Sequence, residues 1–137
     1  MKADAETEKE VMEALNGFIK AYEERNVKGI LELFSPDPDV VFYGNGEDEK
    51  SLGLSGIREQ AEHDWSQGAA LSLKIAWSSV SSAGLVAWLA ADLEIHAGME
   101  GVGMELPARL TAVLEKRDGK WSFMQWHTSL PTIDRQS

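Results

Sequence analysis

The chain lacks cysteine altogether, which excludes disulfide bonds and thiolate chemistry and permits a cytoplasmic location. Basic residues are also scarce: 13 lysines and arginines against 23 aspartates and glutamates give a formal net charge of −10, which disfavours nucleic acids and anionic membranes as partners. The longest weakly polar stretch, residues 85–91, is far too short to cross a bilayer. The polar, mostly charged residues 1–10 are not expected to form a secretory signal. We therefore expect one cytoplasmic globular domain over residues 1–137.

The motifs of several chemistries are missing as well. No glycine-rich phosphate loop follows a strand and no nucleophile elbow surrounds the serines, so nucleotide binding and acyl transfer are not expected. The three histidines, His63, His96 and His127, are far apart in the sequence and lack the His-Glu-x-x-His pattern. His96 is expected at the exposed end of a strand, and His63 with Asp64 is expected as a solvated pair on a helix. We predict no metal centre and no cofactor.

The first half of the chain has mainly helical periodicity. One apolar stripe at helical spacing is formed by Val11, Leu15, Phe18, Ile19 and Tyr22. Asn26 can cap a short second helix, which Pro36 and Pro38 prevent from continuing. Residues 40–43 have the composition of a strand, and residues 47–52 are expected to form a mobile, acidic loop at the rim of a pocket. Ser55 can cap a third helix that ends near Gly68.

The second half alternates with the period of a strand. Leu71, Leu73, Ile75 and Trp77 are predicted to share one buried face, and further strands follow at residues 85–96, 104–116 and 120–129. Three helices followed by an antiparallel meander predict an α+β domain with the helices on one face of the sheet.

The closing hairpin carries the most specific residues. They are Arg109-x-Thr111, the run Arg117-Asp118-Gly119-Lys120-Trp121, and the run from Gln125 to Pro131 that contains His127. Asp-Gly between two β-prone runs predicts a tight turn. These residues resemble the closing hairpin of the SnoaL-like group in the nuclear transport factor 2 superfamily. They are also similar to the association domain of calcium/calmodulin-dependent kinase II.

This resemblance implies a cone-shaped fold, in which three N-terminal helices pack on a curved antiparallel sheet that encloses a pocket. It also implies a homodimer held by the convex face of the sheet. Fold alone does not determine activity. The superfamily includes enzymes that move protons on carbonyl compounds, such as ketosteroid isomerases and polyketide cyclases, and it includes association modules.

Strand parity then selects the candidate site. Trp88 and Asp92 fall on one face of their strand, and we place this face in the pocket with His127. As catalytic residues we select Asp92, the general base or acid, and His127, its partner. The opposite, apolar face with Leu89, Ala91, Leu93 and Ile95 is expected to hold the dimer together. The remaining candidate ligand-binding residues are Tyr43, Trp65, Trp88, Arg109, Thr111 and Gln125.

Two registers of the closing hairpin remain open. A two-residue turn at Asp118-Gly119 would leave Arg109 and Thr111 on the face opposite to His127, whereas a three-residue bulged turn would bring them to one side. Two functions also remain open. The first is binding of a small, partly apolar molecule, with acid–base chemistry on a carbonyl compound if the domain is an enzyme. The alternative is a non-catalytic association or accessory module.

Overall fold

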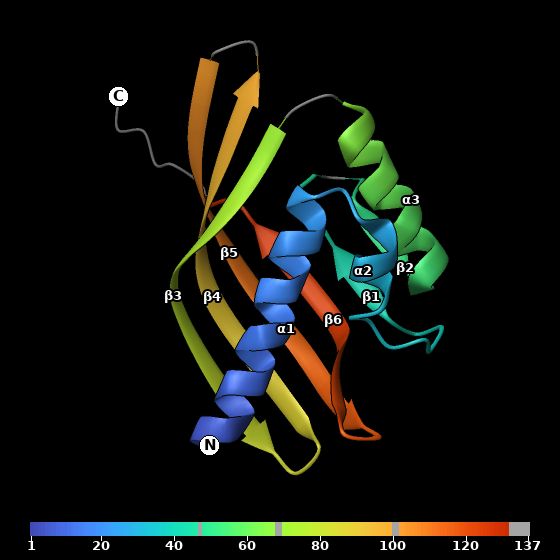
Figure 1. The fold of residues 1–137 in the computed structure, drawn as a ribbon, viewed down its shortest axis with the longest axis vertical. Helices are drawn as coiled ribbons and strands as arrows, with labels where there is room; N and C mark the ends of the chain where they lie inside the picture. The colour runs from blue at the N-terminus through green and yellow to red at the C-terminus, as the bar shows by residue number, and fades with distance from the viewer. Residues whose placement is uncertain (47, 68–69, 100–101, 132–137) are drawn as a thin grey trace.

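The computed structural model describes residues 1–46, 48–67, 70–99 and 102–131. Two helices, two short strands and a third helix are followed by four long strands (Figure 1). The elements are α1 (Ala5–Glu23), α2 (Val27–Leu31), β1 (Val41–Tyr43), β2 (Lys50–Leu52), α3 (Gly53–Ser66), β3 (Ala70–Ala83), β4 (Val86–Met99), β5 (Val102–Arg117) and β6 (Lys120–Ser129). None of the helices in the described ranges has the length and apolar character needed to span a membrane.

The helices begin where their polar caps allow. Asp4 accepts a hydrogen bond from the backbone N–H of Thr7 at 2.8 Å and so caps α1. Asn26 caps α2 as predicted, because its side chain accepts from the N–H of Gly29 at 3.0 Å. The third helix starts at Gly53, two residues before the predicted cap Ser55.

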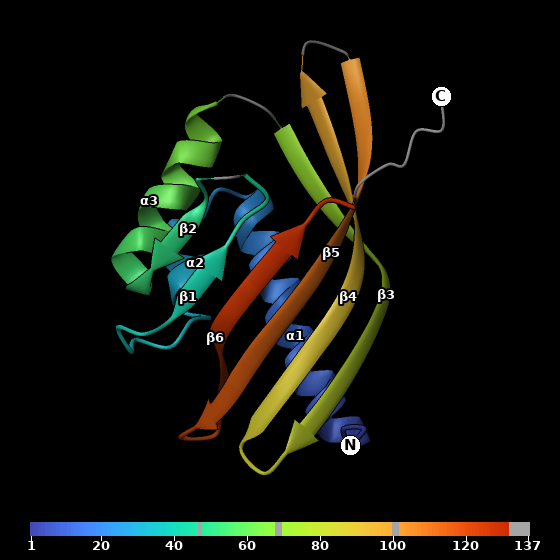
Figure 2. The same cartoon turned by 180° about the vertical axis from the view of Figure 1, so that it is seen from behind.

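The six strands form one curved sheet in the order β2-β1-β6-β5-β4-β3. Strand β1 runs parallel to β6, and all other neighbouring strands are antiparallel. Helix α1 lies across one face of the sheet (Figure 1). In the view from the opposite side, the sheet lies in front of α1 (Figure 2). We call these the helix-covered face and the open face. The α+β fold class predicted from the sequence is confirmed.

The hydrophobic core lies between the helices and the helix-covered face. Leu89, Ala91 and Leu93 are only 2–3% exposed and belong to this core, and Ile95 is packed against it. The prediction that these residues hold a dimer together is therefore wrong. The alternation along the strand was identified correctly, but its two faces were assigned the wrong way round, because an apolar face can be covered by a helix as well as by a second chain.

A bulge in β3 moves Trp77 out of the predicted buried row. Ile75 pairs with Leu93, but Trp77 pairs with Asp92, so Ala76 is an extra residue in the ladder. One extra residue reverses the facing of every residue beyond it. Leu73 and Ile75 therefore remain against the core, whereas Trp77 lies on the open face and is 54% exposed.

A second bulge settles the register of the closing hairpin. Arg117 pairs with Lys120, so Asp118-Gly119 is a two-residue turn in which both residues have positive φ, 53° and 78°. The register then shifts at Met124, and Thr111 pairs with His127. The turn is thus the shorter alternative, while the bulge inside β6 produces the facing expected from the longer one. Arg109, Thr111, Gln125 and His127 consequently share the open face.

The acidic segment 47–52 is more ordered than predicted at its C-terminal end. Lys50–Leu52 forms β2 and pairs with β1, and Ser51 is buried. Glu49 contributes to the preceding turn, since its carboxylate accepts from the N–H of Gly46 at 2.7 Å. Glu47 lies outside the described residues.

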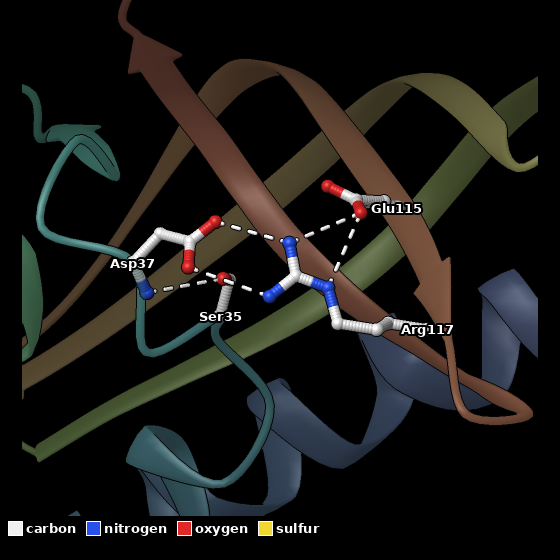
Figure 3. A network of polar contacts seen from close by, with 4 residues as sticks. All are labelled: Ser35, Asp37, Glu115 and Arg117. Carbon is white, nitrogen blue, oxygen red and sulfur yellow. Dashed lines mark hydrogen bonds and ion pairs between the residues drawn. The ribbon is translucent and has the colours of Figure 1, made fainter.

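The segment between α2 and β1 is fastened to the end of β5 by a polar network (Figure 3). Arg117 donates to both carboxylate oxygens of Asp37, at 3.4 and 3.1 Å, and also to Glu115. Asp37 in turn donates its backbone N–H to the hydroxyl of Ser35 at 3.2 Å. The hydrogen bonds from Arg117 lower the pKa of Asp37. The network thus holds the proline-rich segment against the hairpin.

Candidate functional site

Five of the predicted site residues meet on the open face. Tyr43, Trp88, Thr111, Gln125 and His127 line one hollow of about 600 Å³. The β1–β6 and β5–β6 pairings place Tyr43 and Thr111 on either side of His127, and the Tyr43 and His127 rings are 5.2 Å apart. The hollow is completed by Trp77, Ser79, Ser81, Ala90 and Val113, and by Val41, Leu89, Ala112 and Trp126.

The predicted catalytic carboxylate does not line this hollow. Asp92 lies on the same face, directly opposite Arg109 in the β4–β5 ladder, but neither residue is among those that line the cavity. Both residues are exposed. Asp92 therefore lacks the desolvated surroundings on which its assignment as a general base depended.

Trp65 lies on α3, away from the open face. Its ring is 5.8 Å from that of Tyr22, and its buried indole Nε1 has no hydrogen-bond partner among the described residues. Trp65 thus belongs with the helices.

A second cavity, of about 100 Å³, lies between the helices and the helix-covered face. Its walls are mostly apolar and aromatic, with Phe18 from α1, Phe42 from β1 and Trp126 from β6 in mutual contact. Its polar lining comes from Tyr22, Asn45, Glu49, Gln60, Asp64 and Thr128. Apolar walls with a few polar groups are typical of small-molecule sites.

Three of these polar residues form a hydrogen-bonded centre. The Tyr22 hydroxyl donates to Asp64 Oδ2 at 3.0 Å, and Gln60 Nε2 donates to Asp64 Oδ1 at 2.9 Å. Burial, and next the neighbouring Asp64 carboxylate, raise the pKa of Tyr22. Tyr22 is therefore a neutral phenol at physiological pH, and it can donate a hydrogen bond to a carbonyl oxygen.

This centre was not predicted from the sequence. The predicted solvated pair of His63 and Asp64 is wrong for Asp64, because that residue is half-buried and accepts two hydrogen bonds. A signal was present: Ile57, Ala61 and Asp64 are spaced by four and three residues, which puts all three on one helix face. Ile57 and Ala61 are buried, so Asp64 also faces inward.

One further group of side chains in the described ranges is close enough to share a metal ion. It consists of Glu94, His96 and Glu105, on the β4–β5 hairpin. None of the three lines either of the cavities described above.

Three solved structures with the same fold place the chain among known proteins. A Streptomyces avermitilis protein, provisionally assigned as a dehydratase of the NTF2-like family, is 16% identical, has a TM-score of 0.83, and matches 91% of this chain and 97% of its own. A Xanthomonas campestris protein, provisionally assigned as a calcium/calmodulin-dependent protein kinase II association domain, is 23% identical, with a TM-score of 0.78 and coverage of 89% and 86%. An NTF2-like superfamily protein from Salmonella enterica serovar Typhimurium is 19% identical, with a TM-score of 0.82 and coverage of 96% and 95%. At these identities the likeness establishes the fold alone.

No curated protein sequence matches the chain. The family model of the SnoaL-like domain matches residues 11–133, which include all three helices' apolar stripes and the closing hairpin. Since this match spans most of the chain, the protein belongs to the SnoaL-like domain family.

Proposed function

We propose that this SnoaL-like domain binds a small, partly apolar carbonyl compound in the cavity between the helices and the sheet. Domains of this family bind small molecules and often dimerise. The observation that carries the proposal is the hydrogen-bonded centre of Tyr22, Gln60 and Asp64 within aromatic walls. A cavity of about 100 Å³ has room for roughly three water molecules of about 30 Å³ each. It therefore receives the functional end of a ligand rather than a large ring system.

The same centre supports acid–base chemistry. A ligand carbonyl oxygen would replace Asp64 as the acceptor of the Tyr22 hydrogen bond, which leaves one carboxylate oxygen free beside the ligand. That oxygen can take a proton from the carbon next to the carbonyl, while the electron pair moves to the carbonyl oxygen and is stabilised by the phenol. Gln60 keeps the other carboxylate oxygen in place. The reaction class is enolisation, the first step of isomerisation.

The binding test is a thermal-shift screen of small cyclic ketones and enones, followed by titration of intrinsic fluorescence. Trp126 lines the cavity, so a bound compound should quench the emission. Tyr22→Phe keeps the shape of the side chain and should weaken binding about tenfold or more, since it removes the hydroxyl that donates to the carbonyl oxygen. Asp64→Asn removes the proton acceptor and is kept for the test of the chemistry.

His127→Ala and Asp92→Asn are the matched controls, because both residues lie on the open face. Unchanged binding in these two variants supports the cavity beneath the helices. If instead the controls lose affinity while Tyr22→Phe binds as the parent does, the ligand occupies the open-face hollow with Trp88 and His127, and the proposed site is wrong.

Chemistry is tested separately from binding. Exchange of the α-protons of a bound cyclic ketone with deuterated water, followed by NMR, should be faster with the parent than with Asp64→Asn. If the ketone binds but its α-protons do not exchange, the domain is a binding module and the proposed proton transfer is excluded.

A further inference from the structure

Three ligand-type side chains converge at the outer end of the β4–β5 hairpin. His96 on β4 pairs directly with Glu105 on β5, and Glu94 precedes His96 by two residues, so all three share the open face. His96 Nε2 lies 3.7 Å from Glu94 Oε2 and 3.9 Å from Glu105 Oε1. One ligand atom from each residue falls within 4.8 Å of the other two.

These separations are close to those of a metal site. Zinc is bound by histidine nitrogen and carboxylate oxygen at about 2.0–2.2 Å, which puts two ligands of a tetrahedral ion roughly 3.3–3.5 Å apart. The side chains of Glu94, His96 and Glu105 are 38%, 44% and 64% exposed. Rotation of these side chains has to shorten the two histidine–carboxylate distances by a few tenths of an ångström, and the carboxylate–carboxylate distance, which is within 4.8 Å, by up to about 1.5 Å.

The charge of the cluster also favours a cation. Two carboxylates approach one imidazole, and like charges on adjacent strands repel each other unless something neutralises them. Lys74 is the ladder partner of Glu94 on β3, yet within the described part of the chain it forms no ion pair with either glutamate. A divalent ion bound to neutral imidazole would balance both carboxylates.

Space for the rest of a coordination shell is present beside the three ligands. A hollow of about 470 Å³ is lined by His96 and Glu105, and Ser72 on β3 and Met104 on β5 border it. It is separate from the cavity that contains Tyr22. An ion held by three protein ligands would thus keep at least one position for water.

We propose that Glu94, His96 and Glu105 bind a divalent transition cation of the zinc class on the β4–β5 hairpin. Imidazole nitrogen favours such ions over magnesium and calcium, which prefer oxygen ligands alone. The site links two neighbouring strands and is independent of the proposed carbonyl-binding cavity.

The test is calorimetric titration of the chelator-treated full chain with Zn²⁺ at pH 7.5. One equivalent should bind, and His96→Ala and Glu105→Gln should each weaken that equivalent at least tenfold. His63→Ala and His127→Ala remove the other two histidines and should bind as the parent does.

Circular dichroism checks that each variant is folded, as expected for exposed residues. An NMR measurement that needs no substitution accompanies the titration: Zn²⁺ should shift the imidazole signals of His96 and leave those of His63 and His127 in place. The proposal fails if the parent takes up no zinc, if His96→Ala binds it equally well, or if the shifted signals belong to another histidine.

Discussion

At the scale of single residues, the hydroxyl of Tyr22 combines burial with a single strong partner. Its ring packs on Phe18 and Trp65, at centroid distances of 5.9 and 5.8 Å, and its hydroxyl donates to Asp64. Ionisation of the phenol would place a second negative charge beside that carboxylate in a half-buried position. The native state therefore keeps Tyr22 protonated.

A pH dependence follows from the raised pKa of Tyr22. In the unfolded chain a tyrosine has a pKa of about 10. Above that pH the unfolded state has therefore lost a proton that the native state still binds. The stabilisation is fully present below about pH 10 and declines as the pH rises further. Urea unfolding at a series of alkaline pH values should therefore show a steeper loss of stability for the parent than for Tyr22→Phe.

Tyr43→Phe is the matched control for this titration, because Tyr43 lies on the open face and is 44% exposed. It should follow the parent. If Tyr22→Phe and the parent lose stability in parallel above pH 10, the phenol is not buried as described.

At the scale of elements, two bulges decide which aromatic side chains enter the core. The bulge at Met124 turns Trp126 inward, where it is 3% exposed and stacks on Phe42, and turns His127 outward. The bulge at Ala76 turns Trp77 outward. A two-residue turn fixes the register on one side of each bulge: Asp118-Gly119 for the bulge in β6, and Gly84-Leu85, between the paired Ala83 and Val86, for the bulge in β3.

The turn at Asp118-Gly119 can be tested on its own. Gly119 has φ 78°, a conformation in which an added Cβ is strained even though nothing lies within 4 Å of it. Gly119→Ala should lower the free energy of unfolding by about 1 kcal/mol in urea denaturation. Gly98→Ala is the control: its surroundings are equally open, its φ is not in the left-handed region, and its effect should be smaller. Equal losses at the two positions would show that turn strain is not the cause.

At the scale of the whole molecule, the open face carries several large apolar side chains that are exposed to solvent in the single chain. Among the described residues it carries Tyr43, Leu52, Trp77, Val86 and Trp88, each at least 40% exposed. Exposed patches of this kind mark interaction surfaces. We propose that a second copy of the chain covers this face and forms the homodimer.

Neighbouring residues on β4 distinguish dimerisation from folding. Trp88→Glu should give monomers in light scattering while the protomer stays folded, because Trp88 projects from the open face. Leu89→Ala should leave the association unchanged and cost about 2–5 kcal/mol of stability, because Leu89 is 2% exposed in the core.

Leu85→Glu is a control that should leave both the association and the stability unchanged, since Leu85 is 65% exposed in the turn before β4. An unchanged dimer in Trp88→Glu would place the interface elsewhere, and a large ring would favour an association module.

Much of the architecture could be predicted from local patterns. Three features form between residues only a few positions apart in the sequence: the helical stripe of α1, the cap at Asn26 and the turn at Asp118-Gly119. Such features can be recognised from short stretches of sequence. The family resemblance rested on the same short-range runs and was confirmed.

The order of the elements, the α+β class and the alternation along β4 follow from the amino-acid pattern alone. Which alternating face the helices cover depends on how the whole chain packs, since both faces have enough apolar residues to be buried. The same packing also decides where the bulges fall, because an extra residue is tolerated wherever packing on both sides gains from it. The pairing of Tyr22 with Asp64, 42 residues away, and the approach of Glu105 to His96 belong to the same category. Such contacts arise from the closure of the whole chain, and no local periodicity encodes them.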